Sequence, residues 1–265
     1  KMAKGYELNH LFVKLYNRDI KDFGIHDLSQ DLGRKIGEID LVVGGPPCQA
    51  YSTVGKRLVD DPRGKLFQEY YRILKELQPK AFIFENVKGL LSIQKGELFE
   101  KILELFGSLG YHVDHKILNA ADFGTPQIRE RVIVVGSKLN QPFVFPQPTH
   151  YNPDQLLTLP TSIMKPYVTL AEAIGDLPLI ESGEIAIDYA DKPQNSYQRL
   201  MRKNAPAHLM DHSAPKNNQK LIELMKALPD GGTPLYLPES MRPKSGFANT
   251  YSRLWWNRPS TTITR

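Results

Sequence analysis

Two apolar runs, LVVGG within IDLVVGG at residues 39–45 and AFIF within KAFIFENV at residues 80–87, constrain the fold of this chain most strongly. Continuous apolar runs of this length are typical of strands buried on both faces of a parallel sheet. Between the two runs, residues 65–77 carry apolar side chains at helical spacing. A strand, a crossover helix and a second strand predict an α/β unit.

The same alternation continues along the first half of the chain. A helix is predicted over residues 96–110, closed by Gly110, and strands over residues 111–120 and 129–137. The segment at residues 12–23 predicts a short strand and turn, and residues 221–232 a short helix. This alternation of strands and helices predicts a doubly wound, Rossmann-like α/β sheet with helices on both faces.

Beyond residue 140 prolines, asparagines and histidines become frequent, which predicts a domain boundary near residue 155. We therefore expect an α/β domain at 1–155 and a second, smaller, irregular domain at 156–265. Residues 195–220 concentrate basic side chains, and the net charge is +5. Both features favour a polyanionic partner.

Composition excludes several classes of protein. A single cysteine excludes an internal disulfide and fits a reducing compartment, so we expect a cytoplasmic protein. No apolar run is long enough to span a membrane, and no signal peptide is recognisable. The seven histidines are scattered, and HLMDH at 208–212 lacks the glutamate of a metalloprotease helix, so no metal site is expected.

The one cysteine, Cys48, lies in GGPPCQAYS directly after the first apolar run. A lone cysteine is usually a small buried apolar residue. This one follows the carboxyl end of a predicted strand, where ligands bind in open α/β sheets. Glu85 follows the second run in the same way, although a cap or a structural ion pair would also explain a carboxylate there. Cys48 is therefore a candidate nucleophile beside a candidate acid.

A third polar stretch, GTPQIRERVIVVG, begins at residue 124. Gln127, Arg129 and Arg131 alternate, so on a strand they would share one face. Such arginines suit a phosphate or a carbonyl oxygen, or else form salt bridges along an exposed rim.

Together these stretches resemble the C5 cytosine DNA methyltransferases. GGPPCQAYS resembles the family's catalytic Pro-Cys loop, FENVKGL its Glu-Asn-Val motif and NAADFGTPQIRERVIVVG its Gln-x-Arg-x-Arg motif. NRDIKDF, RGKLFQEYYRILKELQPK and YSRLWWNRPSTTIT fall where the family has its third, fifth and ninth motifs. The order matches over nearly the whole chain, and residues 156–245 fall in the family's variable target-recognition region.

The resemblance implies transfer of a methyl group to C5 of a flipped cytosine in double-stranded DNA. Cys48 would add to C6, and Glu85 would hold N3 and the N4 amino group. Arg131 would contact O2 and hold Glu85 in place, while Arg129 and Gln127 would support the loop or the DNA backbone. The carbonyl of Pro46 would accept from N4.

The resemblance also implies S-adenosylmethionine as the methyl donor. The matching cofactor positions are Asp19, Ile20, Pro47, Leu66 and Asn86. For Asp19 alone, the role of a turn aspartate is the preferred interpretation.

The resemblance implies that further positions contact the DNA. The implied substrate contacts are Gln49, Ser52, Val87 and Thr262, with residues 53–65 as a lid. Phosphate contacts are expected from Arg199, Arg202, Lys203 and Lys216, and Arg258 would help Thr262 to order the recognition loops. We expect a monomer of bacterial or phage origin, paired in the cell with a restriction endonuclease.

Two parts of the family pattern are missing, namely the glycine-rich cofactor loop at the start and the tenth motif at the end. A fragment of a longer enzyme is the interpretation that we favour, with a split enzyme or a non-catalytic DNA-binding remnant as alternatives. A fragment would bind the cofactor poorly. Among other functions, a tRNA cytosine methyltransferase ranks below the DNA enzyme because the Cys-Phe-Thr tripeptide typical of those relatives is absent, and a thymidylate synthase because its motifs are absent.

Overall fold

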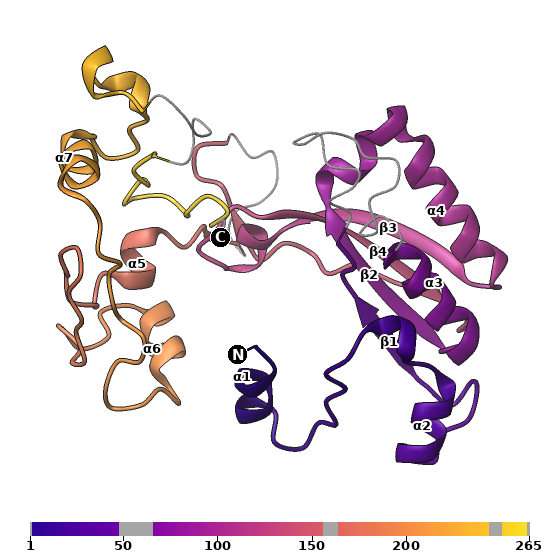
Figure 1. Ribbon diagram of the computed structural model, residues 1–265. Coiled ribbons are helices and arrows are strands. Elements are labelled where there is room, and N and C mark those ends of the chain that lie inside the picture. Colours follow the sequence, from indigo (N-terminus) through magenta and orange to yellow (C-terminus); the bar gives the residue numbers. More distant parts are fainter. Residues whose placement is uncertain (1, 48–65, 156–163, 244–250, 264–265) are drawn as a thin grey trace. The chain divides into compact units, whose positions relative to one another are not determined.

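The computed structural model describes residues 2–47, 66–155, 164–243 and 251–263 (Figure 1). The chain forms two compact units: a sheet unit of residues 1–118 and 130–146, and a second unit of residues 119–129 and 147–265. This division differs from the predicted boundary near residue 155. Segments 119–129 and 147–155 join the second unit because backbone hydrogen bonds connect them to it. Thr149 N donates to Asp122 O at 2.8 Å, and Lys165 N donates to Thr149 O at 3.0 Å.

The sheet unit is built on a mixed sheet, which in the described residues has four strands in the order β1-β2-β4-β3. The strands are β1 Leu41–Gly44, β2 Ala81–Val87, β3 His112–Asn119 and β4 Glu130–Ser137. Strands β1 and β2 run parallel, whereas β2 and β4 run antiparallel. All four strands were predicted from the sequence, and the α/β class is confirmed. The antiparallel partner of β2 was not foreseen.

Two helices cover one face of this sheet, α3 Leu66–Leu77 and α4 Glu97–Ser108, as the sequence predicted. Tyr70 and Leu74 of α3 pack with Phe82 and Phe84 of β2 in one core that also contains Phe106 of α4. A further helix, α2 Ile25–Leu32, packs beside α3 in a second small cluster. The 3-10 segment η4 Lys88–Gly96 connects β2 to α4.

The opposite face of the sheet is open to solvent at β1. Leu41 and Val43 alternate with the core-facing Val42 and are 49% and 64% exposed. Helices on both faces were predicted, but in the described residues the helical cores contact only one face there.

The prediction of a short strand at residues 12–23 is wrong. After helix α1 Met2–Asn9, the described chain is irregular up to the 3-10 turn η1 Ile20–Asp22. Leu11 and Phe12 are 76% and 101% exposed, so no neighbouring strand or core covers their side chains. The turn is capped by Asp19, whose Oδ1 accepts from Lys21 N at 3.0 Å.

The second unit is made of short elements joined by long irregular segments. These are η5 Ala120–Phe123, β5 His150–Tyr151, β6 Lys165–Pro166, α5 Leu170–Ile174, α6 Ser196–Arg202, α7 Gln219–Ala227, η6 Pro234–Tyr236 and η7 Glu239–Met241. The predicted helix at residues 221–232 is confirmed as α7, although it begins and ends earlier. Leu224, Leu228 and Leu237 form its small buried cluster.

Candidate active site

The carboxyl ends of β1 and β2 meet at one edge of the sheet because the two strands run parallel. Asn86, which is 4% exposed, joins the two ends, since its Nδ2 donates to Pro46 O at 3.0 Å. Its Oδ1 accepts from Val87 N at 2.9 Å. Asn86 therefore fixes the start of the loop that leads from β1 toward Cys48. Cys48, Gln49 and Ser52 lie outside the described residues, as does the predicted lid at 53–65.

An ion pair between Glu85 and Arg131 lies at the same edge. Glu85 is opposite Ile133 and Val87 is opposite Arg131, so Glu85 and Arg131 are diagonal neighbours on one face of the sheet. Arg131 Nε lies 2.8 Å from Glu85 Oε1. The Glu85 side chain is 40% exposed and that of Arg131 19%. The carboxylate is thus oriented by a cation and still open to a ligand.

The two glycines before this loop make room for side chains from neighbouring elements. A Cβ on Gly44 would lie 2.5 Å from the ring of Tyr70, and a Cβ on Gly45 would lie 2.8 Å from Glu85 Oε2. The Tyr70 hydroxyl donates to Ile83 O at 2.9 Å, and burial raises the pKa of Tyr70. The absence of a side chain at Gly44 therefore leaves space for the Tyr70 ring in the core, and at Gly45 it leaves space for the Glu85 carboxylate.

The Gln-x-Arg-x-Arg stretch does not lie on a single strand. Strand β4 begins at Glu130, so Arg131 belongs to the sheet whereas Gln127 and Arg129 precede it in the second unit. Gln127, Arg129 and Arg131 are all half-buried, while the residues between them are exposed, so their shared face stays a prediction. Asn119 Oδ1 accepts from Arg129 N at 3.0 Å and holds the backbone just before β4.

The segment near residue 260 also holds residues 126–128, through a parallel β-bridge between Gln127 and Ser260. Ser260 N donates to Pro126 O at 2.9 Å, and Ile128 N donates to Ser260 O at 2.8 Å. Thr262 Oγ1 donates to Ile128 O at 3.0 Å. Arg258 lies 3.3 Å from Asp154 and accepts at its carbonyl from Leu170 N, at the start of α5.

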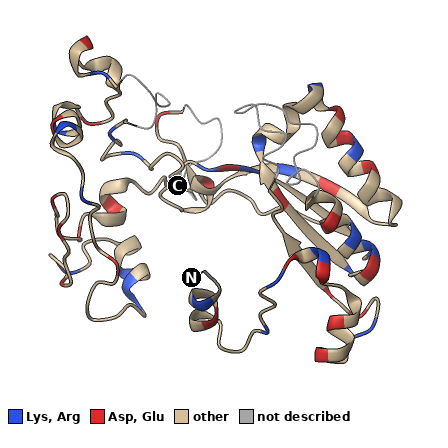
Figure 2. Ribbon diagram, viewed as in Figure 1, with Lys and Arg blue, Asp and Glu red and all other residues tan. Residues whose placement is uncertain are grey.

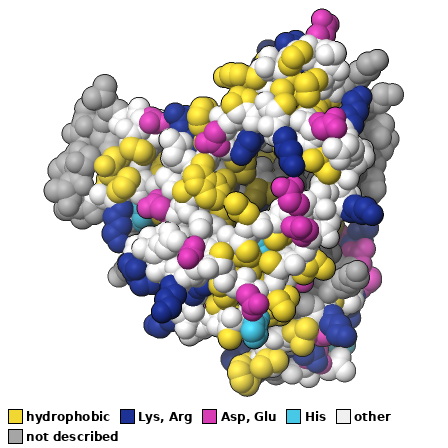
Figure 3. Space-filling model, turned by 90° about the vertical axis from the view of Figure 1, so that its left-hand side faces the viewer, with side chains coloured by type: hydrophobic (Ala, Val, Ile, Leu, Met, Phe, Trp, Pro, Cys, Tyr) yellow, Lys and Arg dark blue, Asp and Glu magenta, His cyan; other side chains and the backbone are white. Residues whose placement is uncertain are grey.

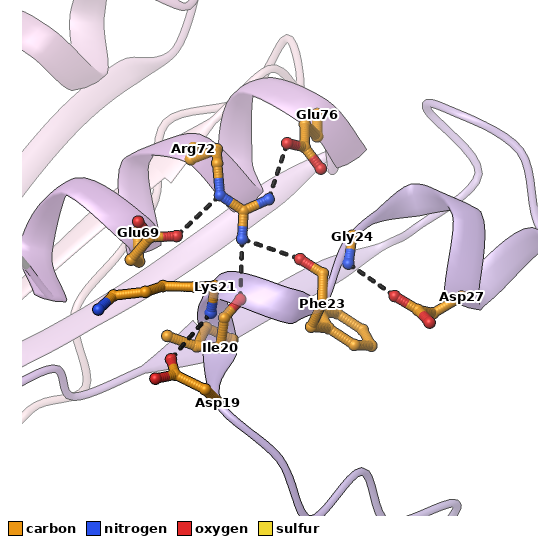
Figure 4. Close-up of polar contacts among 9 residues, drawn as sticks. All are labelled: Asp19, Ile20, Lys21, Phe23, Gly24, Asp27, Glu69, Arg72 and Glu76. Atoms are coloured by element: carbon orange, nitrogen blue, oxygen red, sulfur yellow. Dashed lines mark hydrogen bonds and ion pairs between the residues drawn. The ribbon is translucent and has the colours of Figure 1, made fainter.

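An apolar cavity of about 560 Å³ adjoins β1 in the sheet unit. Ile20, Pro47 and Leu66, three of the predicted cofactor positions, line it. Asp19 is exposed on the η1 turn beside Ile20 (Figure 4). Asn86 does not line the cavity itself but holds Pro46, which does, through a hydrogen bond. A cavity of this size is within the range of small-molecule sites, and its apolar walls suit a flat aromatic ring.

The predicted phosphate contacts differ in their surroundings. Arg199 and Lys203 are exposed on and after α6, and Lys216 is exposed in the segment before α7. Arg202 instead pairs with Asp176, whose side chain is 3% exposed, and lies 3.5 Å over the ring of Tyr189. Arg202 therefore anchors α6 within its unit, and its phosphate contact stays a prediction.

Apart from these positions, acidic and basic side chains are interspersed. Figure 2 shows acidic and basic positions together along α3 and α4. On the face drawn in Figure 3, lysine and arginine lie among acidic and hydrophobic side chains.

The parts of the chain that the structure describes contain no group of three or more histidine, cysteine, aspartate or glutamate side chains suited to a metal ion. Within the same residues, no helix is long and apolar enough to cross a membrane.

Sequence reasoning missed several residues that hold the site together, namely Tyr70, Arg72, Asn119 and Ser260. Arg72 had a visible signal, because Glu69 and Glu76 stand three and four residues away on the same helix. Asn119 and Ser260 lie inside motif stretches quoted above, but their partners Arg129 and Ile128 follow only from the folded chain.

The fold and the strand-end site define a class: a Rossmann-like α/β protein of the methyltransferase type. A crystal structure from E. coli, described as a DNA modification methyltransferase encoded within a prophage, superposes with a TM-score of 0.67. It is 20% identical, over 98% of this chain and 72% of that one, and it supports the fold alone.

Sequence comparison identifies the family. The profile of the C-5 cytosine-specific DNA methylases matches residues 1–259. Type II methyltransferase M1.HphI of Haemophilus parahaemolyticus is 35% identical over 98% of this chain and 60% of its own length. M.DdeI of Desulfomicrobium norvegicum is 36% identical over 94% of this chain and 59% of its own. The chain belongs to the C-5 cytosine-specific DNA methylase family and spans about 60% of the length of these relatives.

Proposed function

We propose that this chain carries the catalytic centre of a DNA cytosine-5 methyltransferase that acts on a cytosine flipped out of double-stranded DNA. The observation that carries the proposal is the Glu85–Arg131 pair at 2.8 Å, at the strand edge from which the loop toward Cys48 departs. Membership of the C-5 cytosine-specific DNA methylase family supports it.

In this proposal the thiolate of Cys48 adds to C6 of cytosine, which converts the ring into an enamine with a nucleophilic C5. Glu85 donates a proton to N3 as negative charge develops there and accepts from the N4 amino group. Arg131 orients Glu85 and binds O2. Once C5 carries the methyl group, its proton would go to a base, the N3 proton would return to Glu85 and elimination of Cys48 would restore the aromatic ring.

The methyl group would come from S-adenosylmethionine. The apolar cavity beside β1 fits its adenine, with Ile20, Pro47 and Leu66 as walls and Asp19 at the rim. Asn86 would keep Pro46 and Pro47 in place through its hydrogen bond of 3.0 Å.

The second unit would recognise the target sequence. Arg199, Lys203 and Lys216 are exposed and would contact phosphates. Each phosphate contact contributes about 0.9 to the slope of log affinity against log salt concentration, so an Arg199→Gln variant would lower that slope by about 0.9. We further propose a cytoplasmic monomer that works beside a restriction endonuclease.

The test is base-resolved sequencing of cytosine methylation on plasmid from a host without its own methyltransferases, expressing the protein from its complete gene. We expect methylation at one fixed short sequence. Glu85→Gln should lower the methylation rate by about 100-fold or more, as loss of a general acid does. Glu130→Gln is the matched control, because Glu130 is on the same strand as Arg131 and pairs with Lys88 at 3.0 Å. No methylation from the wild-type gene, or equal loss in both variants, would refute the proposal.

A further inference from the structure

The side chain of Arg72 connects helix α3 to the η1 turn (Figure 4). Its Nη2 donates to the carbonyls of Ile20 and Phe23, both at 2.8 Å. These carbonyls belong to the first residue of the turn and to the residue that follows it. One nitrogen therefore holds both ends of a turn that lies 49 and 52 residues away in sequence.

The remaining nitrogens of Arg72 are held by its own helix. Nε donates to Glu69 Oε2 at 2.8 Å, and Nη1 donates to Glu76 Oε1 at 2.7 Å. A guanidinium has five N–H groups in a rigid planar fork, and the structure uses four of them here. The two carboxylates thus fix the direction in which Nη2 points.

The turn lies close against α3 because Gly24 leaves space there. A Cβ on Gly24 would be 2.6 Å from Glu76 Oε2. The Arg72 side chain is 30% exposed, so its hydrogen bonds are partly shielded from water. This arrangement is more directional than a surface ion pair, which contributes little by itself.

The residues that Arg72 holds by their backbone are also walls of the apolar cavity. The side chains of Ile20 and Phe23 line the space of about 560 Å³ beside β1. Asp19 directly precedes them and caps the same turn. A shift of this turn would therefore move two walls of the cavity and the carboxylate next to them.

We propose that Arg72 is a positioning residue for the cofactor cavity, holding the segment 19–23 in the shape that receives an adenosyl group. This inference rests on the proposed function. It assigns Arg72 no contact with the cofactor or with the reacting atoms. Its loss should lower cofactor affinity while leaving the chemical step intact.

The test compares Arg72→Lys and Arg72→Gln with Lys75→Gln, a control that removes one positive charge from an exposed position on the same helix. Calorimetry with S-adenosylhomocysteine measures binding, with the wild type and all variants expressed from the complete gene. We expect the dissociation constant to rise about 10-fold, or ~1.4 kcal/mol, in both Arg72 variants and to stay unchanged in the control. Lysine keeps the charge but cannot reproduce the planar fork.

Two further measurements separate positioning from general stability. Hydrogen exchange of the amides at 20–24 should accelerate in both Arg72 variants, while exchange in β2 stays unchanged. The cofactor KM of the methylation reaction should rise, with kcat at saturating cofactor unchanged.

Each outcome decides a different point. If the wild type binds S-adenosylhomocysteine and both Arg72 variants bind it equally well, the inference fails and the proposed function stands. If the wild type does not bind it, the cofactor assignment and the inference fail together. A fall in kcat with an unchanged cofactor KM would also overturn the positioning role.

Discussion

Replacing Gly44 by alanine should destabilise the protein far more than replacing its neighbour Gly45. Neither glycine has a positive φ, so the reason lies in space and not in backbone conformation. A Cβ on Gly44 would lie 2.5 and 2.8 Å from two carbons of the Tyr70 ring. Carbon atoms at rest are separated by about 3.5–4.0 Å, so the ring would have to move by roughly 1 Å.

The Tyr70 ring cannot move freely. It is 8% exposed, packs against Phe84 with centroids 5.5 Å apart and is anchored by its hydrogen bond to Ile83 O. Overpacking a core costs about 1–3 kcal/mol, and a lost hydrogen bond costs about 1 kcal/mol. We therefore expect Gly44→Ala to lower the free energy of unfolding by about 2 kcal/mol or more.

Gly45→Ala meets a different obstacle. Its Cβ would be 2.8 Å from Glu85 Oε2, the end of a flexible side chain that is 40% exposed and can rotate away. The cost in stability should stay below ~1 kcal/mol, the usual worth of an exposed ion pair. Methylation should nevertheless fall, because the rotated carboxylate leaves Arg131.

The assay is urea unfolding of the two variants beside Gly107→Ala. Gly107 lies in α4, and outside its own helix backbone no atom would lie within 4 Å of an added Cβ, so its replacement should be neutral or stabilise by up to ~1 kcal/mol. Equal unfolding midpoints for Gly44→Ala and Gly107→Ala would refute the steric argument. So would a larger loss of stability in Gly45→Ala than in Gly44→Ala.

Three further predictions test other parts of the structure. Asn86→Ala should lower the free energy of unfolding by about 1–3 kcal/mol in urea, because it removes a buried side chain that donates to the partly buried carbonyl of Pro46. Arg202→Gln leaves the buried carboxylate of Asp176 unpaired and should cost about 3 kcal/mol or more in thermal unfolding, whereas exposed Arg199→Gln should cost less than ~0.5 kcal/mol. Burial, together with the charge of Lys165, lowers the pKa of His150 in the folded protein below its ordinary 6.5. The stability that the neutral imidazole contributes is therefore fully present above pH 6.5 and is lost as the pH falls from there through the lower pKa of the folded state. His150→Gln should therefore flatten the pH dependence of the unfolding midpoint between about pH 7 and 5.

The sequence by itself determined the regular elements of the sheet unit. The helical spacing of Tyr70, Ile73, Leu74 and Leu77 gave the buried face of α3, because local periodicity records which side of an element meets the core. The apolar runs gave β1 and β2, and the ordered motifs gave the family. Prediction failed where periodicity is absent, as at the exposed segment around Phe12.

Tertiary structure alone decided how the site is assembled. The antiparallel register of β2 and β4 brings Glu85 to Arg131, and the bond from Asn86 to Pro46 joins two strand ends that are 40 residues apart. The sequence grouped Arg202 with three other basic residues as phosphate contacts. Only the structure shows that Arg202, unlike those exposed residues, is mostly buried in an ion pair with Asp176. A sequence lists which charges and hydrogen-bonding groups are present, whereas their partners depend on distances that only the packed chain sets.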